Sequence, residues 1–239
     1  GCAGAYEERA KKTTKAVAEL LHMAGVNFAV LGKRETCTGD PARRSGNEFL
    51  YQILAAENIE TFKETFGNRG VKKVVVTCPH CFTTIGKDYA QSGYELQMLH
   101  HTQLLNTLVK EGKLKTSPHK ADQKITFHDP CYLGRHNQIY APPRELLEAA
   151  GCDIEEMPRN KERSFCCGGG GGRMWMEEKI GTRINLNRVD EAIETGAPEV
   201  AVACPFCRIM VGDGMVARQS DVEVLDVAQV LLRSVKSAQ

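Results

Sequence analysis

The sequence predicts an α/β protein made of two duplicated, cysteine-rich halves, each with a parallel sheet and flanking helices. Three observations support this prediction: a cysteine motif recurs at an offset of 126 residues, predicted strands alternate with predicted helices, and cysteines follow the ends of strands. Strands that alternate with helices are typical of parallel pairing through βαβ crossovers. We therefore expect two similar halves related by a pseudo-two-fold axis.

The repeat is clearest around two Cys-Pro-x-Cys motifs, where residues 70–81 align with residues 196–207 without a gap. Two further cysteines of each half lie 35 residues apart, Cys2 and Cys37 in the first half and Cys131 and Cys166 in the second. A fixed offset of this kind indicates an internal duplication.

The duplication places the first half at residues 1–115 and the second at residues 120–239. Residues 116–122 are polar and contain Pro118, which is typical of a linker. The chain begins with Gly1 rather than Met, and the strand that opens the second half would precede Gly1 in the first. We interpret the chain as the C-terminal part of something longer or as a trimmed chain.

The elements of the second half follow one another at short spacing. Residues 124–128 predict a short strand, and residues 142–150 predict a helix that ends at Gly151, a common helix terminator. Residues 153–157 predict a weaker strand, which leads into a loop with two adjacent cysteines and five glycines. One long helix is expected after this loop, at residues 173–194.

The β-branched run at residues 199–203 predicts the next strand. A helix is expected after Cys207, then a strand near residues 222–225 and a terminal helix. The first half repeats this order from its first helix, which we expect at residues 7–23.

Composition limits the possible functions. The chain has 31 Lys and Arg against 30 Asp and Glu, a net charge of +1, which favours neither nucleic acid nor an acidic membrane surface. No apolar run approaches the ~18 residues that span a bilayer, and no leader resembles a signal peptide. Ten cysteines in 239 residues are too few for a disulfide scaffold. In a reducing cytosol, clustered cysteines usually bind metal or perform redox chemistry.

The positions of the cysteines predict two metal sites, one in each half. Cys78, Cys131 and Cys204 directly follow predicted strands, at the sheet edge where α/β folds place ligands. The first set would consist of Cys2, Cys37, Cys78 and Cys81. The second set would consist of Cys131, Cys166, Cys167, Cys204 and Cys207. Four thiolates suit an iron–sulfur cluster, and five are too many for a tetrahedral zinc site.

Glycines next to the second set point to the same chemistry. Gly168, Gly169 and Gly170 open a run of five glycines that would let the backbone approach a bulky inorganic group and donate N–H groups to sulfur. The run lacks the Lys-Ser/Thr of a phosphate-binding loop. Nearby basic residues either offset thiolate charge or form a solvated face: Arg43, Arg44, Arg159, Lys161, Arg163 and Arg173.

Other side chains have simpler interpretations. Asp40 is expected to cap a helix, and Cys152 to be a small buried core residue. His80 and His128 lie near cysteines, where they would either tune a cluster or be structural. We expect His100 and His101 to lie in a helix without a functional role. The start of the predicted long helix is expected to pack into the core through Met174, Trp175 and Met176.

Three motifs of the second half together resemble the cysteine-rich CCG-domain family: His-Asp-Pro-Cys at residues 128–131, Cys-Cys-Gly at 166–168 and Cys-Pro-Phe-Cys at 204–207. The resemblance covers essentially the whole chain. It implies two CCG domains, with a noncubane [4Fe–4S] cluster held by five thiolates in the second. The first half departs from the pattern, with Thr38 where a second cysteine is expected. Its four cysteines would hold a cubane [4Fe–4S] cluster or zinc.

The family includes the catalytic proteins of heterodisulfide reductase and membrane-linked proteins that accept electrons from electron-transfer flavoprotein. Residues 37–48 look most like the latter. The resemblance implies an iron–sulfur oxidoreductase subunit that passes electrons from a reduced flavoprotein toward membrane quinone. Its partners would include ferredoxin-type and membrane segments of the same complex or chain, at the cytoplasmic face of the membrane. Two alternatives stay open: a disulfide-reducing catalytic subunit that acts at the cluster, and a zinc-binding structural module.

Overall fold

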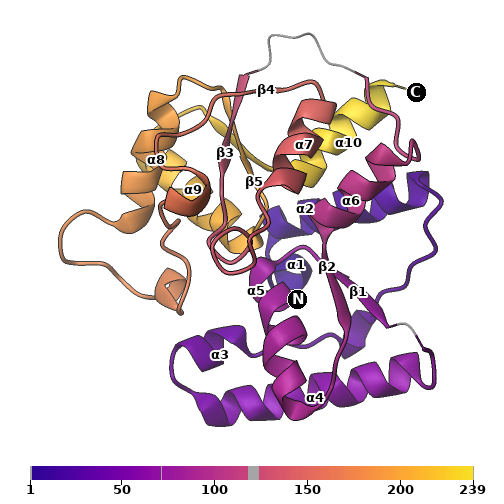
Figure 1. Ribbon diagram of the computed structural model, residues 1–239. Coiled ribbons are helices and arrows are strands. Elements are labelled where there is room, and N and C mark those ends of the chain that lie inside the picture. The colour runs from indigo at the N-terminus through magenta and orange to yellow at the C-terminus, as the bar shows by residue number, and fades with distance from the viewer. Residues whose placement is uncertain (1, 71, 118–123, 239) are drawn as a thin grey trace.

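The computed structural model describes residues 2–70, 72–117 and 124–238, in which two parallel sheets are surrounded by helices (Figure 1). The four-stranded sheet has the order β4-β3-β5-β6, and the two-stranded sheet pairs β1 with β2. The strands are β1 (Lys73–Val76), β2 (Gln97–His100), β3 (Lys124–His128), β4 (Asp153–Ile154), β5 (Glu199–Val202) and β6 (Glu223–Asp226). Parallel sheets with helical crossovers confirm the predicted α/β class.

The elements repeat with the offset of the sequence motif. β1 and β5 lie 126 residues apart, as do β2 and β6. α2 (Glu8–Met23) and α7 (Ala141–Ala149) end at the same offset, and α6 (His101–Lys110) and α10 (Val227–Ser237) begin at it. Each strand and helix of this set therefore has a counterpart in the other half, which confirms the duplication.

The four helices α2, α6, α7 and α10 join the two halves through one apolar core. α2 contacts α10, and α6 contacts α7, so each contact pairs a helix of one half with a helix of the other (Figure 1). Each helix contributes a fully buried leucine: Leu20, Leu105, Leu146 and Leu231. An amphipathic helix must bury its apolar stripe, and here each half supplies the surface that the other half covers.

A second core lies on the other face of the four-stranded sheet, beneath α8 (Ile184–Glu194) and α9 (Pro205–Ala217). β5 supplies both cores, because Ala201 faces the first and Val200 and Val202 face the second. Because helices cover both faces of the sheet, the loops that follow the strands gather at the carboxyl edge of the sheet.

The remaining helices belong mainly to the first half. They are α1 (Cys2–Tyr6), α3 (Asp40–Arg44), α4 (Glu48–Phe66) and α5 (Pro79–Thr83), with a π turn at Thr84–Asp88 and 3₁₀ turns at Gly32–Arg34, Tyr89–Ser92, Lys161–Arg163 and Arg173–Trp175. Of the helices in the described ranges, none is both long and apolar enough to cross a membrane.

Two predicted elements are shorter than expected. The long helix at 173–194 is wrong in its first half: Gly181 adopts a left-handed φ of 69°, and α8 begins only at Ile184. The backbone N–H of Ile184 donates to the Glu178 carboxylate, which stabilises this helix start. Likewise, the strand expected at 153–157 pairs only over Asp153–Ile154. Of the linker expected at 116–122, residues 118–122 lie outside the described residues.

The shared core generates a stability prediction. Leu231→Ala empties a fully buried position where helices of both halves meet, and should lower the free energy of unfolding by about 2–5 kcal/mol. Leu50→Ala makes the same change on α4 at a side chain that is 42% exposed, and should cost less than about 1 kcal/mol. Denaturant titrations of both variants test this, and equal losses would contradict a core shared at Leu231.

Candidate metal centre

The five cysteines of the second set converge at the carboxyl end of the four-stranded sheet. Cys131 follows β3, while Cys204 precedes α9 and Cys207 lies in its first turn. Cys166 and Cys167 come from the loop between β4 and α8. Their thiols interact in succession, from Cys131 to Cys166, Cys167, Cys207 and Cys204. The structure therefore brings together all five residues that the sequence grouped.

The four cysteines of the first set also gather, beside α5. The thiol of Cys2 interacts with Cys37, and Cys78 interacts with Cys81. Cys2 also lies close enough to Cys78 and Cys81 for their charges to act on it. The Thr38 hydroxyl, at the position of Cys167 in the aligned motif, donates to the Cys81 sulfur at 3.7 Å.

The two sets are in contact with each other. The thiol of Cys78 interacts with that of Cys204, so two aligned strand–helix junctions meet across the halves. Beside them, the His80 ring of the first half stacks on Tyr132 of the second, with centroids 3.9 Å apart. The sequence predicted one site per half but did not indicate that the two sites would adjoin.

Crowding prevents these thiols from ionising together. Neighbouring thiols, together with burial, raise the pKa of Cys81, Cys131 and Cys207 well above the ordinary value. The pKa of Cys166 is lowered instead, because the Cys131 and Cys167 thiols donate to its sulfur. Each thiolate is thus stabilised by neighbours that keep their protons. A bound metal supplies the positive charge that would let all of them ionise, so this donor set fits a metal group.

The glycine run contributes N–H donors and space. The N–H of Gly168 donates to the Cys166 sulfur at 3.2 Å, and the backbone of Gly169 hydrogen-bonds to Cys167. Gly168 has a φ of 84°, which favours glycine. A Cβ on Gly169 would lie 3.0 Å from Met210 and 3.6 Å from the Cys167 sulfur, whereas at Gly170 it would approach His80. Gly168 and Gly169 are therefore the two that shape the sulfur site directly.

Asp129 connects the loops that carry the cysteines. Its carboxylate accepts three N–H groups, two from the Arg144 guanidinium and one from the backbone of Lys161, each at 2.8 Å. Its carbonyl accepts the Ser164 hydroxyl at 3.0 Å. These bonds tie the loop of Cys131 to the segment that leads to Cys166. The sequence did not single out Asp129, although it stands between the strand and Cys131 in a motif that had been recognised.

Most of the predicted basic residues are paired with carboxylates. Arg44 binds Asp40 and Asp88, Arg159 binds Glu191, and Arg173 binds Glu178. Arg43 lies 3.3 Å from Asp88 and contacts the Tyr51 ring. Carboxylates therefore compensate these arginine charges locally. The arginines neither serve mainly to offset thiolate charge nor form an unpaired, solvated basic face.

Three further expectations are corrected by the structure. Asp40 does not cap a helix: it is the first residue of α3, and its buried carboxylate accepts from His80 Nδ1 at 2.8 Å. His100 ends β2 and so lies outside a helix, whereas His101 begins α6 as expected; both are fully buried. Of the three residues expected to pack into the core, Met174 does so, whereas Trp175 and Met176 are 63% and 51% exposed, in a segment where the expected helix does not form. Cys152 is buried in the first core, as predicted.

His101 joins the two halves. Its Nε2 lies 3.0 Å from Asp226 Oδ1, and both side chains are buried. Asp226 is the counterpart of His100 at the 126-residue offset, and each precedes its helix in a capping box. The preceding His100 ring lies against the backbone of Thr77 and Ala203, which directly precede Cys78 and Cys204. His100, His101 and Asp226 therefore pack directly behind the contact between Cys78 and Cys204.

Comparison with known proteins agrees with the motifs and their geometry. Residues 1–86 and 125–212 each match the family model of the CCG cysteine-rich domain. The chain belongs to this family. It is similar to the probable iron–sulfur-binding oxidoreductase FadF of Bacillus subtilis (strain 168), with 44% identity over an alignment that covers 100% of this chain and 34% of that protein.

Two other CCG-domain relatives have informative names. The EtfAB:quinone oxidoreductase of Syntrophomonas wolfei is 44% identical over 99% of this chain and 34% of its own length. A component of the dihydromethanophenazine:CoB–CoM heterodisulfide reductase of Methanosarcina barkeri is 34% identical over 97% of this chain and 56% of that component. The chain thus spans about a third to a half of the length of these relatives.

The Asp129 junction generates a prediction about the architecture of the site. Arg144→Ala leaves the Asp129 carboxylate, 3% exposed, without its cation, and should destabilise the fold by about 3–5 kcal/mol. Arg218→Ala breaks a two-bond ion pair with Asp190 at the surface, where both side chains are about 40% exposed, and should cost far less stability than Arg144→Ala. Unfolding free energies measured side by side test the prediction. A loss at Arg144 no larger than that at Arg218 would contradict it.

Proposed function

We propose that this chain is an iron–sulfur electron-transfer module of a heterodisulfide reductase-like oxidoreductase. The observation that carries the proposal is the convergence of five cysteine thiols and two glycine N–H donors at one sheet edge. Thiolates are the ligands of iron–sulfur clusters, and N–H groups directed at sulfur set the reduction potential. The name of the B. subtilis relative, an iron–sulfur-binding oxidoreductase, supports the same function.

In this proposal, the second set holds a noncubane [4Fe–4S] cluster. Its five thiolate ligands would be Cys131, Cys166, Cys167, Cys204 and Cys207. Gly168 and Gly169 would lie against the cluster, with Gly170 following them toward His80. The group would supply one-electron chemistry, while the chain supplies ligands, N–H donors and burial. The successive thiol contacts support five ligands better than four, since no cysteine of the set stands apart.

The first set would hold a [4Fe–4S] cubane or a zinc ion. Four thiolates are present, from Cys2, Cys37, Cys78 and Cys81. Thr38 places a hydroxyl against Cys81 where the full motif has a fifth thiolate, and this substitution supports a four-ligand group. We retain residues 1–115 and 120–239 as the two proposed CCG domains.

The contact between Cys78 and Cys204 supports electron exchange between the two sites, because ligands that touch give a short path. We propose that electrons enter from a reduced flavoprotein such as electron-transfer flavoprotein and continue toward membrane quinone, at the cytoplasmic face of the membrane. The name of the S. wolfei relative favours this direction. The name of the M. barkeri relative favours a second candidate, a catalytic subunit that reduces a disulfide at the second site.

Substitution of one cysteine tests the ligand set. Cys167→Ala should alter or abolish the electron paramagnetic resonance signal of the second site and leave the first-site signal intact. Cys152→Ala is the matched control, because this cysteine is buried in the first core away from both sets. An unchanged second signal would show that Cys167 is not a ligand. Stoichiometric zinc with less than about one cluster of iron in anaerobically purified protein would contradict the whole proposal.

The electron-transfer direction is tested by the donor. Reduced electron-transfer flavoprotein, mixed anaerobically with the iron-loaded protein, should bleach the visible absorbance of the clusters while the flavin is oxidised. The same preparation is then supplied with a chemical reductant and a disulfide substrate. Disulfide turnover without flavin oxidation would favour the reductase candidate over the electron-transfer module.

A further inference from the structure

A buried arginine lies behind the second cysteine set and binds a histidine that faces it. His128 is the last residue of β3, and Arg188 projects from α8; each is 1% exposed. Arg188 Nε donates to His128 Nδ1 at 3.0 Å. An arginine Nε carries one proton and has no acceptor capacity, so the direction of this hydrogen bond is fixed by chemistry.

Other groups hold Arg188 in this position. Its Nη1 donates to Glu191 at 2.7 Å and to the carbonyl of Arg159 at 2.9 Å. Arg188 belongs to the buried stripe of α8, together with Asn185, Val189 and Ala192. The sequence could have indicated Arg188, because it falls on the apolar stripe of a helix. Charged residues are seldom buried there without a partner.

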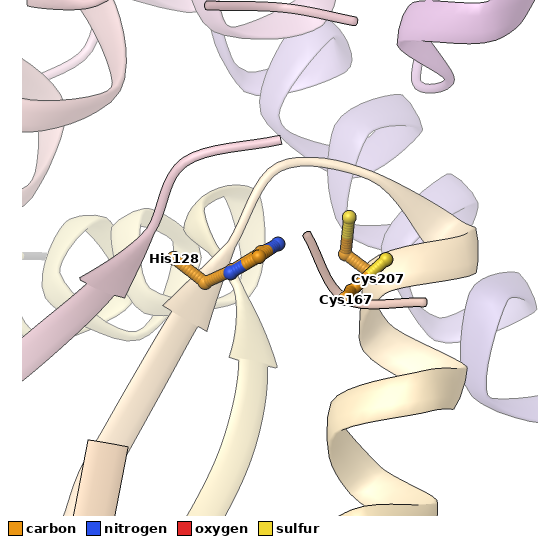
Figure 2. Close-up of side chains that lie close together, drawn as sticks. All are labelled: His128, Cys167 and Cys207. Carbon is orange, nitrogen blue, oxygen red and sulfur yellow. The ribbon is translucent and has the colours of Figure 1, made fainter. Parts of the chain in front are cut away.

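The opposite side of the imidazole faces thiols. A ring nitrogen of His128 and the sulfur atoms of Cys167 and Cys207 all lie within 4.8 Å of one another. Figure 2 shows the distal end of the ring directed from the end of β3 toward these two cysteines. Within the described part of the chain, buried His128 Nε2 has no hydrogen-bond partner. Two opposite roles are possible for this nitrogen: metal ligand or N–H donor.

The arginine decides between these roles. A neutral imidazole has one protonated and one unprotonated nitrogen, and the nitrogen that accepts a hydrogen bond is the unprotonated one. Because Nδ1 accepts from Arg188, the proton resides on Nε2, and a protonated nitrogen has no lone pair for a metal. We propose that Arg188 fixes this tautomer and that His128 Nε2 donates a hydrogen bond to the thiolate of Cys167 or Cys207. His128 is therefore a positioning and tuning residue of the second site and does not bind iron.

The charge state of the ring agrees with this arrangement. Because Nδ1 accepts the proton of Arg188 Nε, the ring cannot be an imidazolium with both nitrogens protonated, and it is therefore neutral. A neutral ring retains the single proton that the tautomer argument requires.

The inference rests on the proposed iron–sulfur cluster at the second set, and its consequence is a shift in reduction potential. An N–H donor at a ligand sulfur stabilises the more negative, reduced state. Loss of the donor should therefore lower the potential of the second site and leave the first site unchanged. At the midpoint potential of the unaltered protein, we expect about a tenfold smaller ratio of reduced to oxidised second site, which is 59 mV for one electron.

The experiment is a redox titration of the iron-loaded protein, followed by electron paramagnetic resonance. His128→Leu removes the donor, and His128→Gln restores an N–H group from a neutral side chain. Thr126→Val is the matched control, since Thr126 is buried two residues earlier on the same strand. His128→Leu should lower the potential of the second site, His128→Gln should recover part of the shift, and Thr126→Val should have no effect.

Pulsed measurements on the unaltered protein give a test that does not depend on the folding of any variant. The reduced second site should couple to a proton that exchanges in D₂O, and it should lack the strong nitrogen coupling of a ligated imidazole. A ligand-strength nitrogen coupling would overturn the inference. So would loss of second-site iron in both His128 variants but not in Thr126→Val, or an unchanged potential in His128→Leu. A preparation of the unaltered protein without iron would instead overturn the proposed function.

Discussion

The arrangement of this molecule depends on the close contact of buried thiols that cannot all lose their protons unaided. Thiol interactions run through the second set and continue through Cys204 to Cys78 in the first. Such a group of sulfurs is stable either as thiols that share protons or as thiolates around a positive charge. Several adjacent thiolates without a positive charge would repel one another. The fold supplies this contact because its halves share one core, which brings the carboxyl ends of their sheets together.

Duplication explains the pairing of the sites, and divergence explains their difference. In the first half, the motif has Thr38 and Asp40, and the carboxylate of Asp40 collects His80, Arg44 and Thr84. In the second half, Phe206 occupies the position that corresponds to His80 in the repeat. The polar ring beside the cysteines of this half is His128. Both sites have a glycine N–H on a cysteine sulfur, but one is flanked by the ion-pair network of Asp40 and the other by the pair of Arg188 and His128. Related sites with different surroundings would have different potentials, which suits transfer in one direction.

Sequence patterns predicted those features that depend on local chemistry. A β-branched run predicted the strand at 199–203, the repeat implied its counterpart before Cys78, and matched spacing grouped cysteines that the structure brings together. The same approach failed at residues 173–183, where Gly181 and the carboxylate of Glu178 start the helix later than its composition suggests. It also could not find the contact between Cys78 and Cys204 or the pair of His101 and Asp226, because these arise from the packing of one half on the other. Contacts between the two halves leave no repeat or spacing pattern in a single sequence.

The buried charges around the second site are paired with opposite charges, so the electrostatic environment of its sulfur atoms comes mainly from N–H dipoles. Arg144 is balanced by Asp129 and Glu156, and Arg188 by Glu191, so these cations add little net charge. By contrast, the N–H groups of Gly168 and Gly169 act directly at cysteine sulfur. Buried ion pairs contribute little net stability, but here they orient a loop and fix a tautomer. The role of these ion pairs is therefore one of orientation: they hold the loop and the imidazole so that N–H groups point at the cysteine sulfur atoms.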